Sequence, residues 1–277
     1  MKTGKNRKKR ILIESIIVVL FLGLWLWSWV PFTEHITLEL SGGDNETTRV
    51  VLITDLHSCY YGPNQNTLIK MVEKQSPDIV ILSGDIFDDK LKEKNAEITV
   101  KRLAEKYPCY YVSGNHEFWT EHIDEIKATI RNAGVTVLEG DCETIDVHGR
   151  IIDICGVDDP TRLTHKEWTE QIKSAYSECK ESHIKILASH RPERVNDYEQ
   201  FGFDLVLAGH AHAGQFRIPF INRGLFAPNQ GFFPEYINGA YKLKNGSTMV
   251  VSRGLAREST PLPRFFNHPQ IVVIDIR

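Results

Sequence analysis

The stretch that decides the fold reads DLVLAGHAH over residues 204–212. Its first five residues form an apolar run typical of a buried strand. Its end places His210 and His212 one residue apart, directly after that strand. Four earlier apolar runs end in the same way, each followed by polar side chains that can bind a metal ion. This recurrence predicts an enzyme site built where several strands end.

The polar clusters follow five strand-like runs and carry carboxylates, imidazoles and an amide. In chain order they are Asp55-Leu56-His57, Gly84-Asp85-Ile86-Phe87-Asp88, Gly114-Asn115-His116-Glu117, Ser189-His190 and Gly209-His210-Ala211-His212. Ligands of open α/β sheets bind at the carboxyl ends of the strands, so the clusters can converge on one crevice. Each cluster alone is also what an ordinary surface turn gives. That alternative requires five independent coincidences at matching positions.

The residue types of these clusters suit a pair of metal ions. Carboxylate, imidazole and amide oxygen ligands favour Zn²⁺, Mn²⁺ or Fe, and no thiolate is placed to compete. Two ions ~3.5–4 Å apart can hold both the attacking and the leaving oxygen of an in-line displacement at phosphorus. A carboxylate must bridge them, and Asp85 is the candidate. We therefore predict two divalent ions, of manganese, zinc or iron, as cofactors.

The five clusters resemble, in order, the motif series of the calcineurin-like metallophosphoesterases: Asp-x-His, Gly-Asp-x-x-Asp, Gly-Asn-His-(Asp/Glu), His and Gly-His-x-His. The resemblance spans residues 55–212. It implies an α/β sandwich of two mixed β-sheets flanked by helices. It also implies a hydrolase in which a metal-bound water or hydroxide attacks a phosphoric ester. Glu117 stands where many relatives have Asp, which is a conservative departure.

The resemblance also implies a role for each matching residue. Two ligand sets are implied, one for each ion: Asp55, His57 and His212 for the first, and Asn115, His190 and His210 for the second. Asp85 would bridge the ions. His116 would be the catalytic group that protonates or stabilises the leaving oxygen, and Asp88 would orient His116.

Two arginines are candidate contacts for a substrate phosphate. Arg191 follows His190, and Arg253 lies in the sequence Ser252-Arg253-Gly254-Leu255. A guanidinium binds phosphate in a bidentate manner, which motivates the prediction. Either arginine can instead be an ordinary salt-bridge partner.

The N-terminal segment has the features of a membrane anchor. Residues 1–10 carry six Lys or Arg and no acid, and residues 11–30 form an apolar run of 20 residues. The run is broken only by Glu14, Ser15 and Ser28, and such a helix reaches ~30 Å, the thickness of a bilayer core. Trp25, Trp27 and Trp29 near its end are typical of an interfacial belt, and the basic end would stay in the cytoplasm. A cleaved signal peptide would need a small-residue cleavage site, which is missing, and a buried core helix would not be apolar all round.

These features predict how the chain is divided. The predicted parts are a basic cytoplasmic tail at 1–10, a transmembrane signal-anchor helix at 11–30, a linker and first strand at 31–48, and a metallophosphoesterase domain at 49–277. The catalytic domain would lie outside the cytoplasm, held to the cell membrane by a single pass. The net charge is −3 although the tail is strongly basic, so the remainder is acidic and no nucleic-acid partner is expected.

Apolar and amphipathic patterns predict the remaining elements. Strands are expected at 49–54, 78–82, 109–112, 135–138, 144–147, 150–155, 183–188, 204–208, 240–243, 248–252 and 270–276. Helices are expected at 67–75, 95–106 and 121–132, and after a capping box formed by Thr164 and Glu167. A loop of about 25 residues after His212 is the longest segment without predicted structure, and such loops are usually functional.

Five cysteines occur, at 59, 109, 142, 155 and 179, with no C-x-x-C pair. Cys142 and Cys155 lie on neighbouring strand-like runs, which leaves a disulfide open. We nevertheless expect buried free thiols, which behave as small hydrophobic side chains.

Further sequence features indicate one branch of this family. The predicted anchor, together with the sequences at 189–192, 212–215 and 252–255, is similar to the bacterial YkuE/YaeI-type phosphodiesterase branch. The expected activity is that of a membrane-anchored phosphodiesterase or pyrophosphatase. A phosphomonoesterase or protein phosphatase would share the metal ligands, and a non-catalytic cell-envelope binding protein could dispense with His116.

Aromatic residues of the long loop suggest an amphiphilic substrate. They are Phe216, Phe220, Phe226, Phe232, Phe233 and Tyr236. With a membrane anchor, they motivate the hypothesis of a lipid-linked phosphodiester or pyrophosphate. The alternative is that these rings pack the loop onto the domain.

Overall fold

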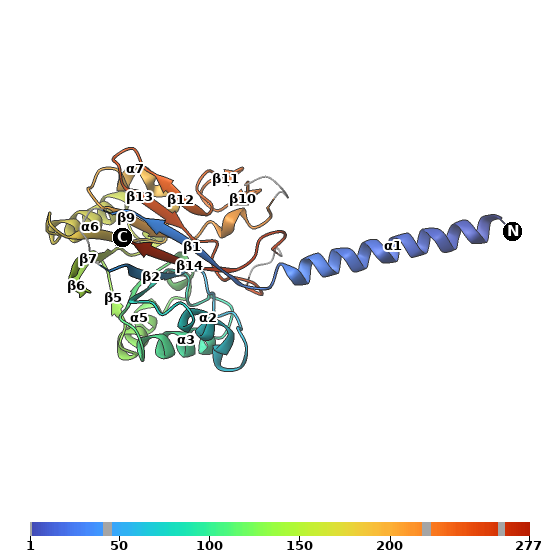
Figure 1. The fold of residues 1–277 in the computed structure, drawn as a ribbon, viewed down its shortest axis with the longest axis horizontal. Coiled ribbons are helices and arrows are strands. Elements are labelled where there is room, and N and C mark those ends of the chain that lie inside the picture. The colour runs from blue at the N-terminus through green and yellow to red at the C-terminus, as the bar shows by residue number, and fades with distance from the viewer. Residues whose placement is uncertain (1, 41–45, 218–222, 260–263) are drawn as a thin grey trace.

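The computed structural model describes residues 2–40, 46–217, 223–259 and 264–277, and its domain consists of two six-stranded sheets that pack face to face (Figure 1). The first sheet has the order β1 (Phe32–Leu38), β14 (Gln270–Ile276), β2 (Thr48–Ile53), β3 (Ile79–Ser83), β4 (Cys109–Val112) and β5 (Thr136–Val137). The second has the order β12 (Gly239–Lys242), β13 (Thr248–Val251), β9 (Leu205–Ala208), β8 (Ile184–Ala188), β7 (Arg150–Gly156) and β6 (Asp141–Val147).

Both sheets are mixed, as the family resemblance implies. Strands β2 to β5 run parallel, and so do β7, β8, β9 and β13. Antiparallel neighbours are β14 beside β2, β6 beside β7 and β12 beside β13. The parallel strands therefore point their carboxyl ends to one edge of the domain in each sheet.

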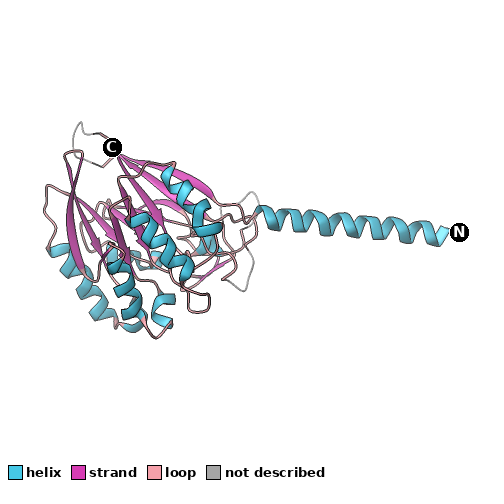
Figure 2. Ribbon diagram, turned by 90° about the horizontal axis from the view of Figure 1, so that it is seen from below, coloured by secondary structure: helices cyan, strands magenta, loops and turns pink. Residues whose placement is uncertain are grey.

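Helices cover the outer faces of the sandwich. The longer helices of the domain are α2 (Asn66–Glu73), α3 (Lys94–Ala104), α5 (Ile123–Asn132) and α6 (His165–Ser177), and α4 (Asn115–Trp119) and α7 (Val195–Tyr198) are short. Figure 2 views the domain from the side of α2, α3 and α5 and shows them in front of the strands. The capping box of α6 is confirmed, because Thr164 Oγ1 accepts from Glu167 N and Thr164 N donates to Glu167 Oε2.

The alternation of side chains along the strands builds the core. In β2, Val50 and Leu52 pack between the two sheets, whereas Val51 and Ile53 pack under the helices. Successive residues of a strand point to opposite faces, so a strand buried on both faces is apolar throughout. A third apolar cluster lies between the second sheet and α6, with Trp168 at its centre.

Helix α1 (Lys2–Trp27) extends away from the domain (Figures 1 and 2). Its described apolar side chains are largely solvent-exposed, and Phe21 contacts Phe265 at 4.7 Å between ring centroids. Over the described part of the chain, no helix combines the length and the apolarity needed to cross a membrane. The prediction of a spanning helix at 11–30 is thus not supported, and the helix ends at Trp27 because the chain turns there toward β1.

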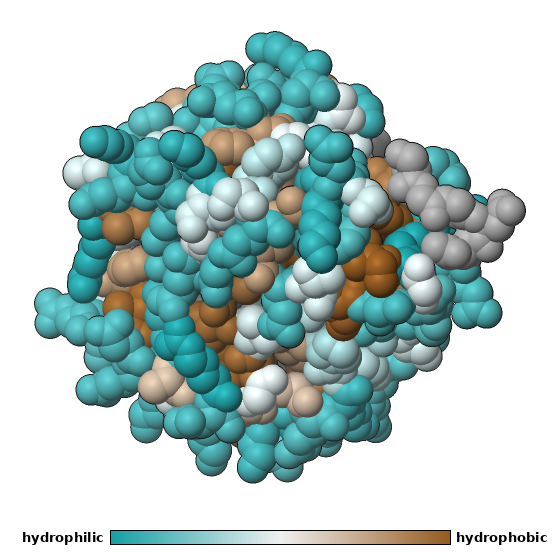
Figure 3. Space-filling model, turned by 90° about the vertical axis from the view of Figure 1, so that its left-hand side faces the viewer, coloured by the Kyte–Doolittle hydropathy of each residue, from teal (hydrophilic) through white to brown (hydrophobic). Residues whose placement is uncertain are grey.

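The long loop after His212 contains more structure than predicted. It begins with a 3-10 turn, η4 (His212–Gly214), and includes a small hairpin of β10 (Phe226–Ala227) and β11 (Gly231–Phe232). Phe220 lies outside the described residues. The hairpin lies at the end of the domain from which α1 emerges, whereas the opposite end is mostly hydrophilic (Figures 1 and 3).

The expectation of free thiols at Cys142 and Cys155 is wrong, because the structure joins them as a disulfide. The two residues are direct cross-strand partners in β6 and β7, with Cα atoms 4.0 Å apart. The sequence reveals two neighbouring strands but not their register, and only the register brings the two sulfurs together. Cys59, Cys109 and Cys179 are free.

Packing between the sheets predicts a large effect of one core substitution. Leu52 is fully buried in the intersheet core, so Leu52→Ala should lower the free energy of unfolding by about 2–5 kcal/mol. Urea denaturation measures the change. Leu26→Ala is the matched control, since Leu26 is 60% exposed on α1 and should change stability by less than about 0.5 kcal/mol. Equal effects of the two substitutions would contradict the location of the core.

Candidate metal centre

The five predicted clusters come together where the two sheets meet at their carboxyl ends. Ser83, the last residue of β3, links the sheets because its hydroxyl donates to the carbonyls of Ser189 and Leu207. His190 in turn donates from Nδ1 to the Ser83 carbonyl at 2.9 Å. Asp55 N donates to the Gly84 carbonyl, so the loops after β2 and β3 are also joined. These bonds place residues from both sheets around one point.

The backbone at the centre adopts conformations that side chains disfavour. Asp55, His57, Asp85, His210 and His212 all have positive φ angles, between 45° and 63°. Each such residue costs of order 1 kcal/mol and persists only where its surroundings enforce it. Five of them around one site indicate that the fold accepts strain in order to orient these side chains.

Two glycines let the chain approach the acidic residues closely. A Cβ atom on Gly114 would overlap both the carboxylate and the backbone N of Asp85. A Cβ atom on Gly209 would lie 2.6 Å from Asp55 Oδ2 and 2.7 Å from Thr54 Cβ. The glycines in the Gly-Asn-His and Gly-His motifs are therefore required by packing against the acidic side chains.

The predicted ligands form two adjoining groups. Asp55, His57 and His212 offer ligand atoms that lie within 4.8 Å of one another, and so do Asp85, His190 and His210. The first group is the set predicted for one ion, and the second contains His190 and His210 of the other predicted set together with Asp85, the predicted bridge. Asp85 also reaches the first group, because its Oδ2 lies 3.6 Å from His57 Nε2 and 3.0 Å from His190 Nε2. Asp85 thus occupies the position expected of a bridging carboxylate.

Buried polar atoms at this point lack hydrogen-bond partners among the described residues. They are His57 Nε2, Asp85 Oδ2, Asn115 Oδ1, His190 Nε2 and His210 Nδ1. Although His190 Nε2 is close to Asp85 Oδ2, the two do not have hydrogen-bond geometry. A buried polar atom without a partner costs about 1–3 kcal/mol, and several facing one another would be hard to maintain. Nitrogen and oxygen donors in this arrangement fit divalent metal ions.

The pKa values of the four predicted ligand imidazoles are shifted in two directions. Burial, aided by the Arg191 guanidinium, holds the pKa of His210 well below its usual range, and burial and His57 do the same for His212. Neutral imidazoles keep the lone pair that a metal ion needs. For His190, the carboxylates of Asp85 and Asp55 outweigh burial and raise the pKa to about 10, and the hydrogen bond to Asp88 outweighs burial and raises the pKa of His57. Burial tends to raise the pKa of Asp85, but the facing imidazoles of His190 and His116 outweigh it and keep that pKa well below its usual value.

The partners of His116 differ from the prediction. His116 Nδ1 lies 2.6 Å from Asp89 Oδ1 and 3.5 Å from Asp88 Oδ1. Asp88 instead binds His57 Nδ1 at 2.9 Å and accepts from the backbone N–H groups of Lys90 and Leu91. Asp88 therefore orients the ligand His57, while the neighbouring Asp89 holds His116. The motif spacing could not distinguish two consecutive aspartates.

The two arginines have different positions. Arg191 lines the pocket, where its Nη1 lies 2.9 Å from His210 Nε2 and donates to Asn229 Oδ1. Its other nitrogens bind both oxygens of Asp159, which fixes the guanidinium. Arg253 does not join it, since its guanidinium stacks over the Phe32 ring at 5.1 Å, away from the residues that line the pocket. A phosphate contact of Arg253 stays a prediction, since this residue is not among those that line the pocket.

Several residues of the centre were missed by the sequence interpretation. Asn229 accepts from Arg191 and lies 2.9 Å from His210 Nε2, and Asp159 anchors Arg191. Glu117 accepts from the backbone N–H groups of Gly114, Asp85, Ile86 and Phe87, so it ties the β3 and β4 loops together. Glu117 was noted only as a motif variant, and its burial raises its pKa to about 7, with the Asp85 charge adding to the effect.

A pocket of about 380 Å³ opens over the centre. Its lining is shared by metal-ligand candidates and by groups suited to a substrate: Asp85, Asn115, His116, Trp119, Pro160, Thr161, Arg191, Arg194, His210, His212, Pro228 and Asn229. The side chain of His116 is 18% exposed, so it can touch a molecule in the pocket. Cationic and neutral groups on the rim suit an anionic ligand.

The sequence of residues 48–214 matches the family described as calcineurin-like phosphoesterase. This match covers more than half of the protein, which therefore belongs to the calcineurin-like phosphoesterase family. This membership agrees with the α/β sandwich and the His/Asp clusters described above. The boundaries predicted at 1–10, 11–30, 31–48 and 49–277 stay predictions.

Several bacterial relatives have similar sequences. An uncharacterized metallophosphoesterase of Campylobacter jejuni is 30% identical, over 83% of this chain and 59% of that protein. The uncharacterized metallophosphoesterase YkuE of Bacillus subtilis is 26% identical over 90% and 86%, and phosphodiesterase YaeI of Escherichia coli is 28% identical over 65% and 66%. The predicted resemblance to YkuE and YaeI is thus confirmed. The chain spans about three fifths of the length of the Helicobacter pylori and Campylobacter relatives.

The contact between Gly114 and Asp85 gives a direct test of the centre. Gly114→Ala keeps an allowed backbone, since φ is −113°, but its methyl group displaces the Asp85 carboxylate. We expect reduced metal content, measured by elemental analysis after dialysis, and a loss of about 1–3 kcal/mol of stability. Gly23→Ala has no neighbour within 4 Å and serves as the control. Unchanged metal content in Gly114→Ala would contradict the role of this contact.

Proposed function

We propose that the protein is a dinuclear metal-dependent phosphodiesterase or pyrophosphatase. The observation that carries this proposal is the set of buried, unpartnered ligand atoms around Asp85 at the floor of the pocket. The first ion would be held by Asp55, His57 and His212, the second by Asn115, His190 and His210, and both by Asp85. When bound, such ions stabilise negative charge on a phosphoryl group and supply a nucleophile at neutral pH.

The protein's own groups would position the ester and handle the proton. Arg191, fixed by Asp159, offers positive charge at the pocket wall beside His210. His116 would give a proton to the leaving oxygen from Nε2, because Asp89 holds the other ring nitrogen. Trp119, whose ring lies 4.5 Å from that of His116, restricts how the imidazole can turn. Asp88 contributes indirectly by orienting His57.

Two substitutions separate metal binding from proton transfer. Asp85→Asn should lower both metal content and turnover, the latter by more than the ~10–100-fold typical of residues that only orient a ligand. His116→Ala should keep the metal and reduce turnover by about 10²–10⁴-fold. Elemental analysis and steady-state assays with bis-p-nitrophenyl phosphate measure both. His122→Ala is the control, because His122 is paired with Glu93 and is not among the residues that line the pocket.

The outcome also decides between function classes. Full turnover in Asp85→Asn would contradict the bridging role, and metal loss without a kinetic defect in His116→Ala would contradict the role of that imidazole. Faster hydrolysis of p-nitrophenyl phosphate than of the diester would favour a phosphomonoesterase or protein phosphatase. Metal binding with no hydrolysis of either would favour a non-catalytic envelope protein.

We further propose that the domain is held at a membrane by residues 1–30, outside the cytoplasm, and that its substrate is lipid-linked. The support is the arrangement of exposed apolar side chains. The phenylalanines of the hairpin region, Phe226, Phe232 and Phe233, are 45%, 72% and 57% exposed. They lie at the end of the domain from which α1 emerges (Figure 1). Pro228 and Asn229, at the turn of the same hairpin, line the pocket. A lipid whose tail binds to the hairpin would therefore place its phosphate group near the centre.

Activity on two substrates tests this part of the proposal. The full chain in phospholipid vesicles should hydrolyse a lipid pyrophosphate, and Phe232→Ser with Phe233→Ser should reduce that rate at least tenfold while leaving bis-p-nitrophenyl phosphate hydrolysis unchanged. Tyr60→Ser, which changes an exposed aromatic residue outside the hairpin, is the control. Equal loss on both substrates, or no loss on either, would contradict a lipid-binding role of the hairpin.

A further inference from the structure

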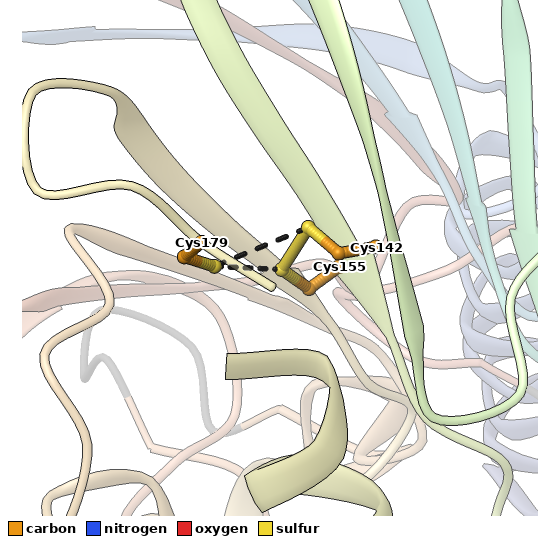
Figure 4. A group of neighbouring side chains, drawn as sticks. All are labelled: Cys142, Cys155 and Cys179. Carbon is orange, nitrogen blue, oxygen red and sulfur yellow. Dashed lines mark hydrogen bonds between the residues drawn. A yellow bond between two sulfur atoms is a disulfide. The ribbon is translucent and has the colours of Figure 1, made fainter. Parts of the chain in front are cut away.

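Three of the five cysteines gather on the face of the second sheet that α6 covers (Figure 4). Cys142 of β6 and Cys155 of β7 form the disulfide, and Cys179 lies just beyond the end of α6. The thiol sulfur of Cys179 is 3.2 Å from Cys155 Sγ and 4.0 Å from Cys142 Sγ. The metal centre uses none of these residues. A free thiol in contact with a disulfide is the arrangement from which thiol–disulfide exchange begins.

We propose that Cys142, Cys155 and Cys179 form a thiol–disulfide exchange site in which Cys155 is the shared sulfur. The Cys179 thiolate attacks Cys155 Sγ, a Cys155–Cys179 bond forms, and the Cys142–Cys155 bond breaks. Cys142 leaves as a thiolate and takes up the proton that Cys179 released. The step moves a cross-link without net oxidation or reduction, so it requires no external oxidant.

Contacts of the three residues explain why Cys155 is the shared sulfur. Cys155 is fully buried in the middle of the group, whereas Cys142 and Cys179 are partly buried on either side of it. The Cys179 sulfur is closer to the sulfur of Cys155 than to that of Cys142. Its position is set by the C-terminal turn of α6, where the Cys179 N–H donates to the Tyr176 carbonyl. Both sulfur distances are short, so the thiol lies beside the S–S bond. Attack along the bond requires rotation of the partly exposed Cys179 side chain.

Charged groups around Cys179 make the exchange slow at neutral pH. Partial burial, together with the Asp153 carboxylate on β7, raises the pKa of Cys179 to about 11. Glu178 and Asp204 act in the same direction, whereas Lys185 on β8 opposes them. His183 is engaged by Asp153 through Nδ1 at 2.9 Å. The thiolate is the attacking species. As long as the pH stays below that pKa, each increase of one pH unit should therefore raise the thiolate fraction and the exchange rate about tenfold.

The exchange changes which elements are cross-linked. The observed disulfide ties the edge strand β6 to β7, and β6 has β7 as its only neighbour in the described sheet. The alternative disulfide would instead tie the end of α6 to β7 and leave β6 held by backbone hydrogen bonds. An edge strand without its cross-link is easier to displace, so the exchange would loosen this side of the domain.

Peptide mapping of the full-length protein tests the site. Samples are held in glutathione redox buffer, quenched with acid, alkylated and analysed by mass spectrometry. Cys142→Ser should contain a Cys155–Cys179 disulfide, and Cys179→Ser should retain Cys142–Cys155. In the wild type, both pairs should be found, and they should interconvert about a hundredfold faster at pH 9 than at pH 7.

Three results would overturn the proposal. The first is that Cys155 and Cys179 remain unpaired thiols in a folded Cys142→Ser protein, under conditions where the wild type forms a disulfide. Another is a wild-type protein in which only Cys142–Cys155 is found even after incubation at pH 9. The third is a purified protein that has no disulfide and holds a soft metal ion on the three thiolates. Wild-type mapping needs no substitution, so a variant that fails to fold does not remove the test.

Discussion

The structure depends on the burial of charged side chains at the junction of two sheets, with Asp85 at its centre. A carboxylate removed from water is costly unless charges or hydrogen bonds compensate for it. Here the compensation comes from imidazoles of both sheets and from the backbone N–H of His116, which donates to Asp85 Oδ1. Burial alone would keep this carboxylate protonated, and its lowered pKa shows that the neighbouring imidazoles dominate. The remaining unpartnered oxygen and nitrogens are what a pair of cations would satisfy.

Local conformational cost accompanies this electrostatic arrangement. The left-handed backbone angles at the ligand residues and the close approach of Gly114 and Gly209 to carboxylates would be unfavourable in an ordinary loop. Burial of the strands on both faces offsets that cost, because it stabilises the strands from which these loops begin. Glu117 and Ser83 then join loops and sheets directly at the site. Stability is thus concentrated in the strands, and function lies at their ends.

The two ends and faces of the domain differ in chemical character. The end from which α1 emerges carries exposed phenylalanines beside the pocket, while the opposite end is mostly hydrophilic with apolar residues between the hydrophilic ones (Figure 3). The three neighbouring cysteines (Figure 4) belong to the apolar cluster beside α6, and none of them lines the pocket. A reaction at the metal centre and an exchange among the cysteines would therefore proceed on separate surfaces of one fold.

The sequence by itself determined the sandwich, the order of its strands along the chain and the metal-ligand candidates, because alternation and strand-end motifs are local patterns. The resemblance to known motifs and the capping box of α6 were equally readable. Only the tertiary structure decided which of two consecutive aspartates contacts His116 and that the Arg253 guanidinium stacks over Phe32. It also decided that Asn229 accepts a hydrogen bond from Arg191. It also decided the disulfide and the third sulfur beside it. These contacts join residues that strand register and loop conformation bring together, and neither is encoded by spacing along the chain.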